Sequence, residues 1–317
     1  MFNFYNRLKT IYLYKVSLIG LFLCLSASCS GEKIDTGQVF RMPITNEPPT
    51  LDWSLATDSV SFDILTNIME GLTQYDSNMD PIPAIAKRWE ISKNKKIITY
   101  YLRDDVFWTD GKPVTAHDFE YSWKRLLNPA TAAQYAYFLF DVENAQEFNS
   151  GKISDSSLVG VSAKNDHILE VRLKKAVVYF PSITTFMVTF PQRKDIVEKF
   201  GDHWTDPENI VSNGPFKLSE WKHEYKLTLT ANENFYEGPP QIDKILAYVV
   251  REKTTALTLY ETGELDMVEL PPVAIPHFRN HDEYENLPQL RGYYYGINVL
   301  KAPFDNSLVR RAFAHSI

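Results

Sequence analysis

Cysteine is scarce in this 317-residue sequence: there are two, Cys24 and Cys29, and none follows. The rest of the chain can therefore form neither a disulfide framework nor a cysteine-ligated metal site. Glycine-rich phosphate loops and the Gly-x-Ser-x-Gly elbow are also absent, so no motif indicates a nucleotide hydrolase or a serine hydrolase. Stability must come from a hydrophobic core, and 44% hydrophobic residues are enough to build one.

Positive charge is in deficit as well. Lysine and arginine number 33 against 40 acidic residues, a net charge of −7. Arg7, Lys9 and Lys15 are the only charged residues among the first 28, so the remainder is more acidic still. This balance argues against nucleic-acid binding, which depends on basic surface. Aromatic residues are abundant at 14%, and serve either core packing or ring-lined ligand pockets.

The N-terminus has the pattern of an export signal. Three basic residues precede an apolar run over 16–25, which is too short to span a bilayer of about 30 Å. Ser26, Ala27 and Ser28 then precede Cys29, which resembles a bacterial lipobox. We expect a signal peptide over 1–28, lipidation at Cys29 and a polar tether over 29–38. The alternative is ordinary cleavage near Ser28, with Cys29 incidental.

Strand and helix signals alternate along the remaining chain. Extended, β-branched or alternating runs predict strands over 97–103, 168–173, 226–231 and 242–251. Thr115 with Asp118 three residues later predicts a capped helix whose buried face holds Phe119 and Trp123. Thr254 similarly predicts a helix start and Gly263 its C-terminal stop. The alternation predicts an α/β fold.

Several short motifs occur in a characteristic order. They are Glu47-Pro48-Pro49-Thr50-Leu51-Asp52, Glu70-Gly71-Leu72, Trp108-Thr109-Asp110-Gly111, Asn213-Gly214-Pro215, Gly263-Glu264-Leu265-Asp266 and Pro303-Phe304-Asp305. Asp110-Gly111 predicts a turn, and Asn213-Gly214-Pro215 combines a residue tolerant of positive φ, a glycine and a rigid proline. In this order the motifs resemble those of the oligopeptide- and dipeptide-binding proteins of ABC importers, extracellular solute-binding protein family 5.

That resemblance implies an α/β, periplasmic-binding-protein-like clamshell of type II with two lobes. Lobe one would comprise residues 39–68 and 189–265, interrupted by a smaller inserted domain over 69–188. Lobe two would start at 266, and residues 266–317 would be only its beginning. A helix predicted from Asn306 or Ser307 runs almost to Ile317, and family members are longer. We therefore expect most of lobe two to be missing.

The resemblance also implies ligand contacts. Thr57 and Asp58 follow the region where the family meets its peptide, and Tyr135 fits a pocket-lining ring of the inserted domain. Tyr260 and Glu264 lie where the chain passes towards lobe two. For each, a surface loop, a core ring or a solvated helix end is an equally plausible role.

The implied function is capture of short peptides for the permease and ATPase subunits of an ABC importer, by a monomer without cofactor or catalytic residues. It would act in the periplasm or at the outer face of the membrane, anchored by its lipid. His277 and His281 are spaced for a shared helix face, but Pro276 and the polar run 279–283 predict an exposed segment, so no metal site is expected. The alternatives are another solute (a nickel complex, haem or sugar), a non-functional fragment, and a secreted hydrolase.

Overall fold

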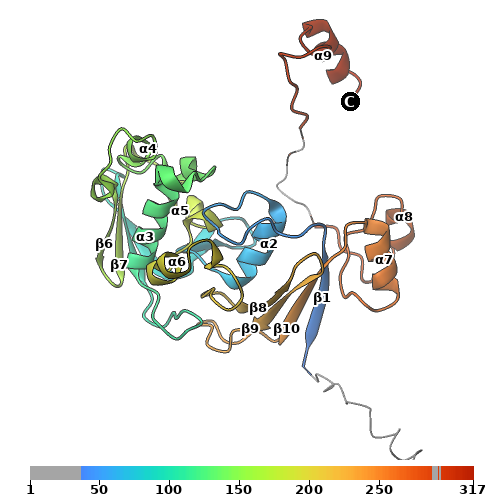
Figure 1. The fold of residues 1–317 in the computed structure, drawn as a ribbon, viewed down its shortest axis with the longest axis horizontal. Helices are drawn as coiled ribbons and strands as arrows, with labels where there is room; N and C mark the ends of the chain where they lie inside the picture. The colour runs from blue at the N-terminus through green and yellow to red at the C-terminus, as the bar shows by residue number, and fades with distance from the viewer. Residues whose placement is uncertain (1–36, 288–291, 293) are drawn as a thin grey trace, which may run out of the picture. The chain divides into compact units, whose positions relative to one another are not determined.

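The computed structural model describes residues 37–287, 292 and 294–317 (Figure 1). The predicted signal peptide, Cys29 and most of the tether lie outside the described residues. The chain divides into two compact units, one ending at Glu269 and the other running from Leu270 to Ile317. In the described part of the chain, no helix is both long and apolar enough to cross a membrane.

The first sheet joins segments that lie far apart in the sequence. Its strand order is β1-β10-β9-β8. β1 (Val39–Ile44) runs parallel to β10 (Lys244–Val249), with Val39 opposite Lys244. β10, β9 (Lys226–Ala231) and β8 (Phe216–Lys222) pair antiparallel. The strands predicted over 226–231 and 242–251 are thereby confirmed, the second over the shorter range 244–249, and the structure shows that they pair with each other.

The second sheet is antiparallel throughout and has the order β4-β5-β7-β6. It consists of β4 (Ala86–Ile91), β5 (Ile97–Leu102), β7 (Ile168–Arg172) and β6 (Val161–Asn165). Along β5 every second side chain is buried, because one face of the sheet meets the core and the other meets solvent. A separate ribbon pairs β2 (Thr73–Tyr75) with β3 (Pro81–Pro83).

Helix α3 (Ala116–Leu127) covers the second sheet by packing on β6 and β7. Thr115 is its N-cap, as predicted, and the Asp118 carboxylate accepts hydrogen bonds from the Thr115 amide at 2.8 Å and from its hydroxyl at 3.0 Å. Burial raises the pKa of Asp118, and the bonds from Thr115 oppose that effect. Phe119 and Trp123 are fully buried, so the predicted apolar face is confirmed.

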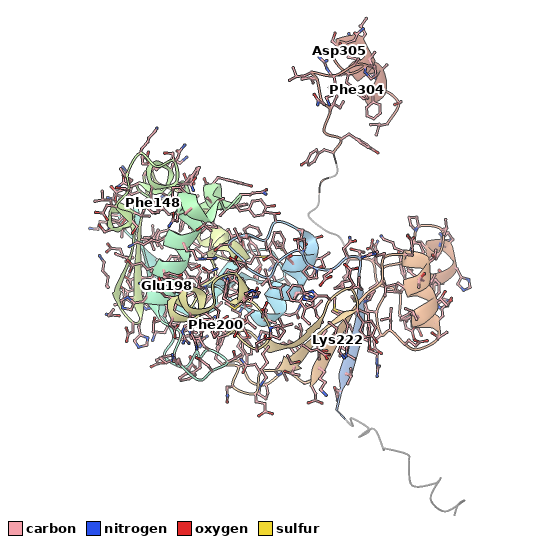
Figure 2. The ribbon with its side chains drawn as sticks, viewed as in Figure 1. Phe148, Glu198, Phe200, Lys222, Phe304 and Asp305 are labelled. Carbon is pink, nitrogen blue, oxygen red and sulfur yellow. The ribbon has the colours of Figure 1, made fainter. Side chains whose placement is uncertain are left out.

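The remaining helices of the first unit are shorter. α2 (Ser59–Ile68) packs on β8, and α7 (Lys253–Glu261) follows β10. Four-, five- and seven-residue helices are α5 (Phe180–Ile183), α4 (Ala145–Asn149) and α6 (Lys194–Phe200). Figure 2 shows Phe148 on α4 and Glu198 and Phe200 on α6. The 3-10 turns are η1 (Pro129–Thr131), η2 (Ala136–Leu139), η3 (Ser156–Leu158), η4 (Met187–Thr189) and η5 (Gly201–His203).

The start of α7 differs from its prediction. Glu252 rather than Thr254 is the N-cap residue, and no side chain caps the helix end. The helix therefore begins one residue before the threonine. Gly263 does follow its C-terminus with φ +79°, a left-handed conformation that glycine adopts without strain.

The turn at Asn213-Gly214 holds the end of α2. The Asn213 side-chain oxygen accepts from the Glu70 amide at 2.9 Å, and the Gly214 amide donates to the Ile68 carbonyl at 2.9 Å. Neither Asn213 nor Gly214 has positive φ, so the predicted conformational reason for the motif is wrong. The reason is close approach, since a Cβ at Gly214 would lie 2.5 Å from the Ile68 carbonyl carbon.

The described part of the second unit contains two helices, α8 (Ile275–Phe278) and α9 (Ser307–Ala314). Asn306 caps α9 through a 2.9 Å bond from the Leu308 amide, as one of the two predicted caps. Phe313 packs edge-on against Phe304 and Tyr295. Most described side chains of this unit are exposed, among them Val273, Tyr294 and Leu300.

Candidate functional site

The loop before α2 brings two predicted ligand residues, Thr57 and Asp58, to the N-terminus of that helix. Asp58 is the N-cap residue, with extended backbone at φ −115°. One carboxylate oxygen accepts from the Ser61 amide at 2.9 Å and the other from the Ser61 hydroxyl at 2.7 Å. Asp58 therefore stabilises the N-terminus of α2 as its capping residue.

Tyr135 contacts this loop, although it lies far from it in the sequence. Its hydroxyl donates a 3.2 Å hydrogen bond to the Thr57 carbonyl, across 78 residues of sequence. Both side chains are partly buried, so the pair lies at the surface rather than in the core. The structure thus brings together two of the predicted contacts, one from each side of the expected boundary at residues 68 and 69.

Five aromatic rings surround this contact, and we call them the aromatic shelf. They come from α2, from η2 with its preceding residue, and from the residue before η4: Phe62, Tyr135, Tyr137, Phe138 and Phe186. Tyr135 has its ring centroid 5.5 to 6.3 Å from those of the other four. Phe186 also contacts Phe62 at 5.5 Å and Phe138 at 4.8 Å. The shelf is therefore one continuous cluster.

Tyr260 and Glu264 belong to a different part of the unit. Tyr260 lies in the last turn of α7, partly buried, and its carbonyl accepts from the Gly263 amide at 2.9 Å. Glu264 is exposed and accepts from the Thr262 hydroxyl at 3.3 Å. Two residues on, the Asp266 carboxylate accepts from the Arg41 amide of β1 at 2.6 Å, which attaches this turn to the first sheet. Their roles in ligand binding remain predictions.

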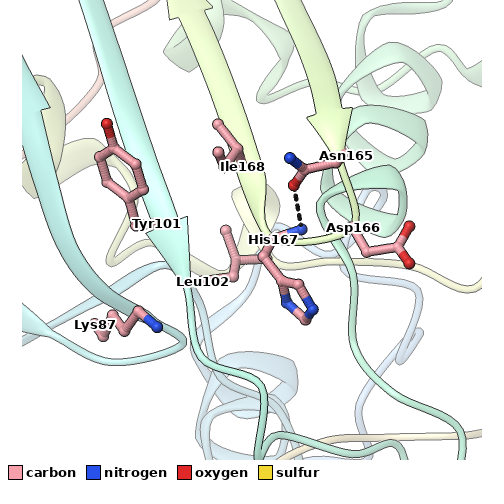
Figure 3. A pocket seen from close by; sticks show the side chains of 7 residues that line it. All are labelled: Lys87, Tyr101, Leu102, Asn165, Asp166, His167 and Ile168. Atoms are coloured by element: carbon pink, nitrogen blue, oxygen red, sulfur yellow. Dashed lines mark hydrogen bonds between the residues drawn. The ribbon is translucent and has the colours of Figure 1, made fainter.

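A pocket of about 440 Å³ lies elsewhere, at the ends of β5 and β7 (Figure 3). Its lining comes from β4, β5, the end of β6, the β6–β7 turn and the start of β7: Lys87, Tyr101, Leu102, Asn165, Asp166, His167 and Ile168. Asn165 holds the turn by accepting from the His167 amide at 2.9 Å. Neither a predicted ligand residue nor a member of the aromatic shelf lines this pocket.

Glu70 is the carboxyl group with the most unusual environment. It follows α2, and its Oε2 atom and the Tyr236 hydroxyl are both buried without a hydrogen bond of ordinary length. Burial raises the pKa of Glu70 to about 7; Tyr236 and the Arg103 guanidinium oppose this rise, and Glu237 adds to it. Arg103 lies 4.8 Å from the centre of the Tyr236 ring. These groups link the end of α2, the end of β5 and the segment after β9.

Metal ligation finds no support in the geometry of the histidines. α8 ends at Phe278, so His277 and His281 do not share a helix face, although their ring centroids are 5.5 Å apart. Both are exposed, as predicted for this segment. Over residues 37–287, 292 and 294–317, no three His, Cys, Asp or Glu side chains are grouped as metal ligands.

Sequence reasoning missed four members of the aromatic shelf and the environment of Glu70. Phe62, Tyr137, Phe138 and Phe186 are indistinguishable from core rings in the sequence. What unites them is a contact between segments more than 120 residues apart, from Phe62 to Phe186. One feature of the sequence could have indicated part of the aromatic shelf: four of the six residues at 135–140 are aromatic.

Comparison with known proteins yields one family. Residues 80–317 match the profile described as "Bacterial extracellular solute-binding proteins, family 5 Middle". The dipeptide-binding protein DppE of Bacillus subtilis is 36% identical over 293 residues, which is 92% of this chain and 53% of that protein. The probable deoxycholate-binding periplasmic protein YgiS of Escherichia coli is 34% identical, over 87% of this chain and 52% of its own length.

Solved structures agree with the sequence comparison. The Escherichia coli murein tripeptide binding protein MppA superposes with a TM-score of 0.83 at 31% identity, covering 89% of this chain and 56% of that one. The predicted fold class is confirmed over the shared part. This chain spans about half the length of the relatives that it matches.

Proposed function

Because this chain belongs to the bacterial extracellular solute-binding proteins of family 5, we propose that it captures short peptides outside the cytoplasmic membrane for an ABC importer. Delivery would be to the permease and ATPase subunits of that importer. The family consists of binding proteins, and accordingly we assign this chain a binding role without a catalytic step. Two of the relatives above bind a dipeptide and a murein tripeptide by their names, which supports peptide as the ligand class.

The observation that carries the proposal is the bond between the Tyr135 hydroxyl and the Thr57 carbonyl. It joins the loop before α2 to the residue that precedes η2, and it places the backbone of that loop beside the aromatic shelf. A peptide needs both kinds of surface, because its backbone must be hydrogen-bonded while its side chains are buried. Tyr260 and Glu264 on the α7 side would contribute to the same ligand in the whole protein.

Equilibrium dialysis tests this function. The whole chain is dialysed against an equimolar mixture of tri- to pentapeptides, and the retained ligands are identified by mass spectrometry. Retention of peptides is expected. Parallel dialyses against maltotriose, a nickel–histidine complex, haem and deoxycholate test the other solutes, and retention of one of these without any peptide would overturn the proposal. Release of free amino acids from the peptides would instead indicate a hydrolase.

Export and anchoring form a second part of the proposal. We propose that residues 1–28 direct export, that Cys29 becomes lipidated, and that the protein functions as a monomer held at the membrane by its lipid. Membrane fractionation of cells expressing the chain and its Cys29→Ser variant tests the anchor. The original chain should sediment with membranes and the variant should be released in soluble form. Equal sedimentation of both would refute lipidation at Cys29.

A further inference from the structure

The aromatic shelf exposes ring surface that its own packing does not cover. Tyr137 is 54% exposed and stacks on Phe138 with centroids 4.7 Å apart. Phe62, Tyr135, Phe138 and Phe186 are partly buried and rest on the core. Apolar surface in water is unfavourable by about 25 cal/mol per Å², so contiguous exposed rings are typical of binding surfaces.

Two polar groups beside the shelf are engaged within the protein. The Tyr135 hydroxyl donates to the Thr57 carbonyl, and both carboxylate oxygens of Asp58 accept from Ser61. The shelf therefore offers a ligand ring faces and ring edges rather than free charge. An anionic ligand side chain placed on it would lose hydration and lie near the Asp58 carboxylate, whereas an apolar one would gain contact area.

Ring geometry adds a preference within apolar groups. Around Tyr135 the neighbouring rings of Tyr137 and Phe138 stand nearly perpendicular, at 88° and 81°. A ring on the ligand can add to these edge-to-face contacts, because the positive edge of one ring is attracted to the negative face of the next.

Building on the proposed peptide capture, we propose that the aromatic shelf selects peptides that carry an apolar, and preferentially an aromatic, side chain. Tyr137 and Phe186 are then specificity-determining residues: Tyr137 as the exposed surface of the shelf, and Phe186 as the ring that ties α2 to η2.

Calorimetric titration of the whole chain tests this selection. The ligands are Ala-Ala-Ala and the tripeptides in which each position in turn is Phe or Asp. At one position at least, Phe should bind about tenfold more tightly than Asp, as expected for one additional buried ring contact against a charge. In Tyr137→Ala this preference should fall by about three- to tenfold.

Tyr225→Ala is the matched control. Tyr225 is also 54% exposed and contacts one ring, Tyr248, but it lies in the turn before β9. This variant should keep the full preference for Phe. Phe186→Leu retains an apolar side chain and should lower the preference for Phe over Asp peptides, which keeps the test valid should Tyr137→Ala fold poorly.

The outcomes separate the two proposals. Equal affinity for all the tripeptides, unchanged in Tyr137→Ala, would overturn selection by the shelf and leave peptide capture standing. Tighter binding of Asp peptides than of Phe peptides would also overturn it. Absence of binding to every peptide would refute peptide capture itself.

Discussion

Arg125 and Asp52 form a bidentate ion pair across 73 residues of sequence, with Nη1 to Oδ1 at 2.9 Å and Nη2 to Oδ2 at 2.6 Å. Asp52 is 5% exposed and also accepts from the Trp204 indole at 3.2 Å and the Ser54 amide at 3.0 Å. The Gln192 side-chain amide donates as well, at 3.5 Å. Five donors thus satisfy a carboxylate that would otherwise be buried at high cost. The motif ending at Asp52 therefore fixes the N-terminal loop to α3.

Removing the Asp52 charge should destabilise the fold. In Asp52→Ala the Arg125 guanidinium loses its partner in a largely buried position, and we expect the free energy of unfolding to fall by about 3 kcal/mol. Urea unfolding followed by tryptophan fluorescence measures this change. A loss below about 0.5 kcal/mol would contradict the account, because that is the size of a surface effect.

Glu198→Gln provides the comparison for that experiment. Glu198 on α6 (Figure 2) pairs with Lys194 at 3.8 Å, with both side chains more than half exposed. An exposed pair contributes little, so its loss should change the free energy of unfolding by less than about 0.5 kcal/mol.

Gly214→Ala should be damaging for a steric reason. The added Cβ would lie 2.5 to 2.8 Å from backbone atoms of Ile68 and Met69, which cannot move without shifting the end of α2. We expect a loss of about 2–3 kcal/mol in stability, measured by thermal and denaturant unfolding. Gly296→Ala is the control, since a Cβ there meets nothing within 4 Å. Similar effects at both positions would argue against close approach.

Local signals in the sequence predicted local structure well. Thr115 with Asp118 identified the start of α3, and Asn306 the start of α9. Alternating runs identified β7 and β9, a β-branched and aromatic run identified β5, and a longer mixed run identified β10. Asp110-Gly111 is the predicted turn, with Gly111 at φ +85°. Each of these depends on residues within a few positions of one another.

Contacts between distant segments were beyond the same reasoning. The motif around Gly214 suggested that a flexible backbone is required there. Glycine is required instead because Ile68, which lies 146 residues earlier, leaves no room for a Cβ. Thr57 and Tyr135 were selected through family resemblance, and nothing in either segment predicts that their atoms bond to each other. Glu70 likewise looks like an ordinary glutamate until Tyr236 and Arg103 are placed around it.

The pH dependence of stability should report on Glu70. Its pKa in the folded protein is about 7, above the usual 4.5, so the folded state holds a proton that the unfolded state has released between these values. The free energy of unfolding should therefore decrease as pH rises from about 4.5 to 7, by up to about 3 kcal/mol from this group. Urea unfolding at half-unit pH steps measures the slope.

Substitution separates Glu70 from the other carboxyl groups. Glu70→Gln cannot ionise, so its stability should decline less over pH 4.5–7 and exceed that of the original chain at pH 8. Glu233→Gln changes an exposed glutamate in the segment after β9 and should keep the original slope. An unchanged slope in Glu70→Gln would show that another group titrates in this range.

Tyr135→Phe removes only the hydroxyl that bonds to Thr57. The ring contacts remain, while the Thr57 carbonyl loses its donor, so stability should fall by about 1 kcal/mol. Peptide affinity should fall by about three- to tenfold, because the loop before α2 is less firmly held. Titration and unfolding of the same preparation measure both effects. An intact affinity despite the lost stability would remove this bond from the binding site.

Capture of peptides is tested most directly by calorimetric titration of the whole chain with Ala-Phe-Ala at neutral pH, alongside maltotriose and deoxycholate. We predict saturable, one-to-one binding of the tripeptide, with neither of the other two solutes competing for the site. Saturable binding of maltotriose or deoxycholate, with no heat from any tripeptide, would contradict the account.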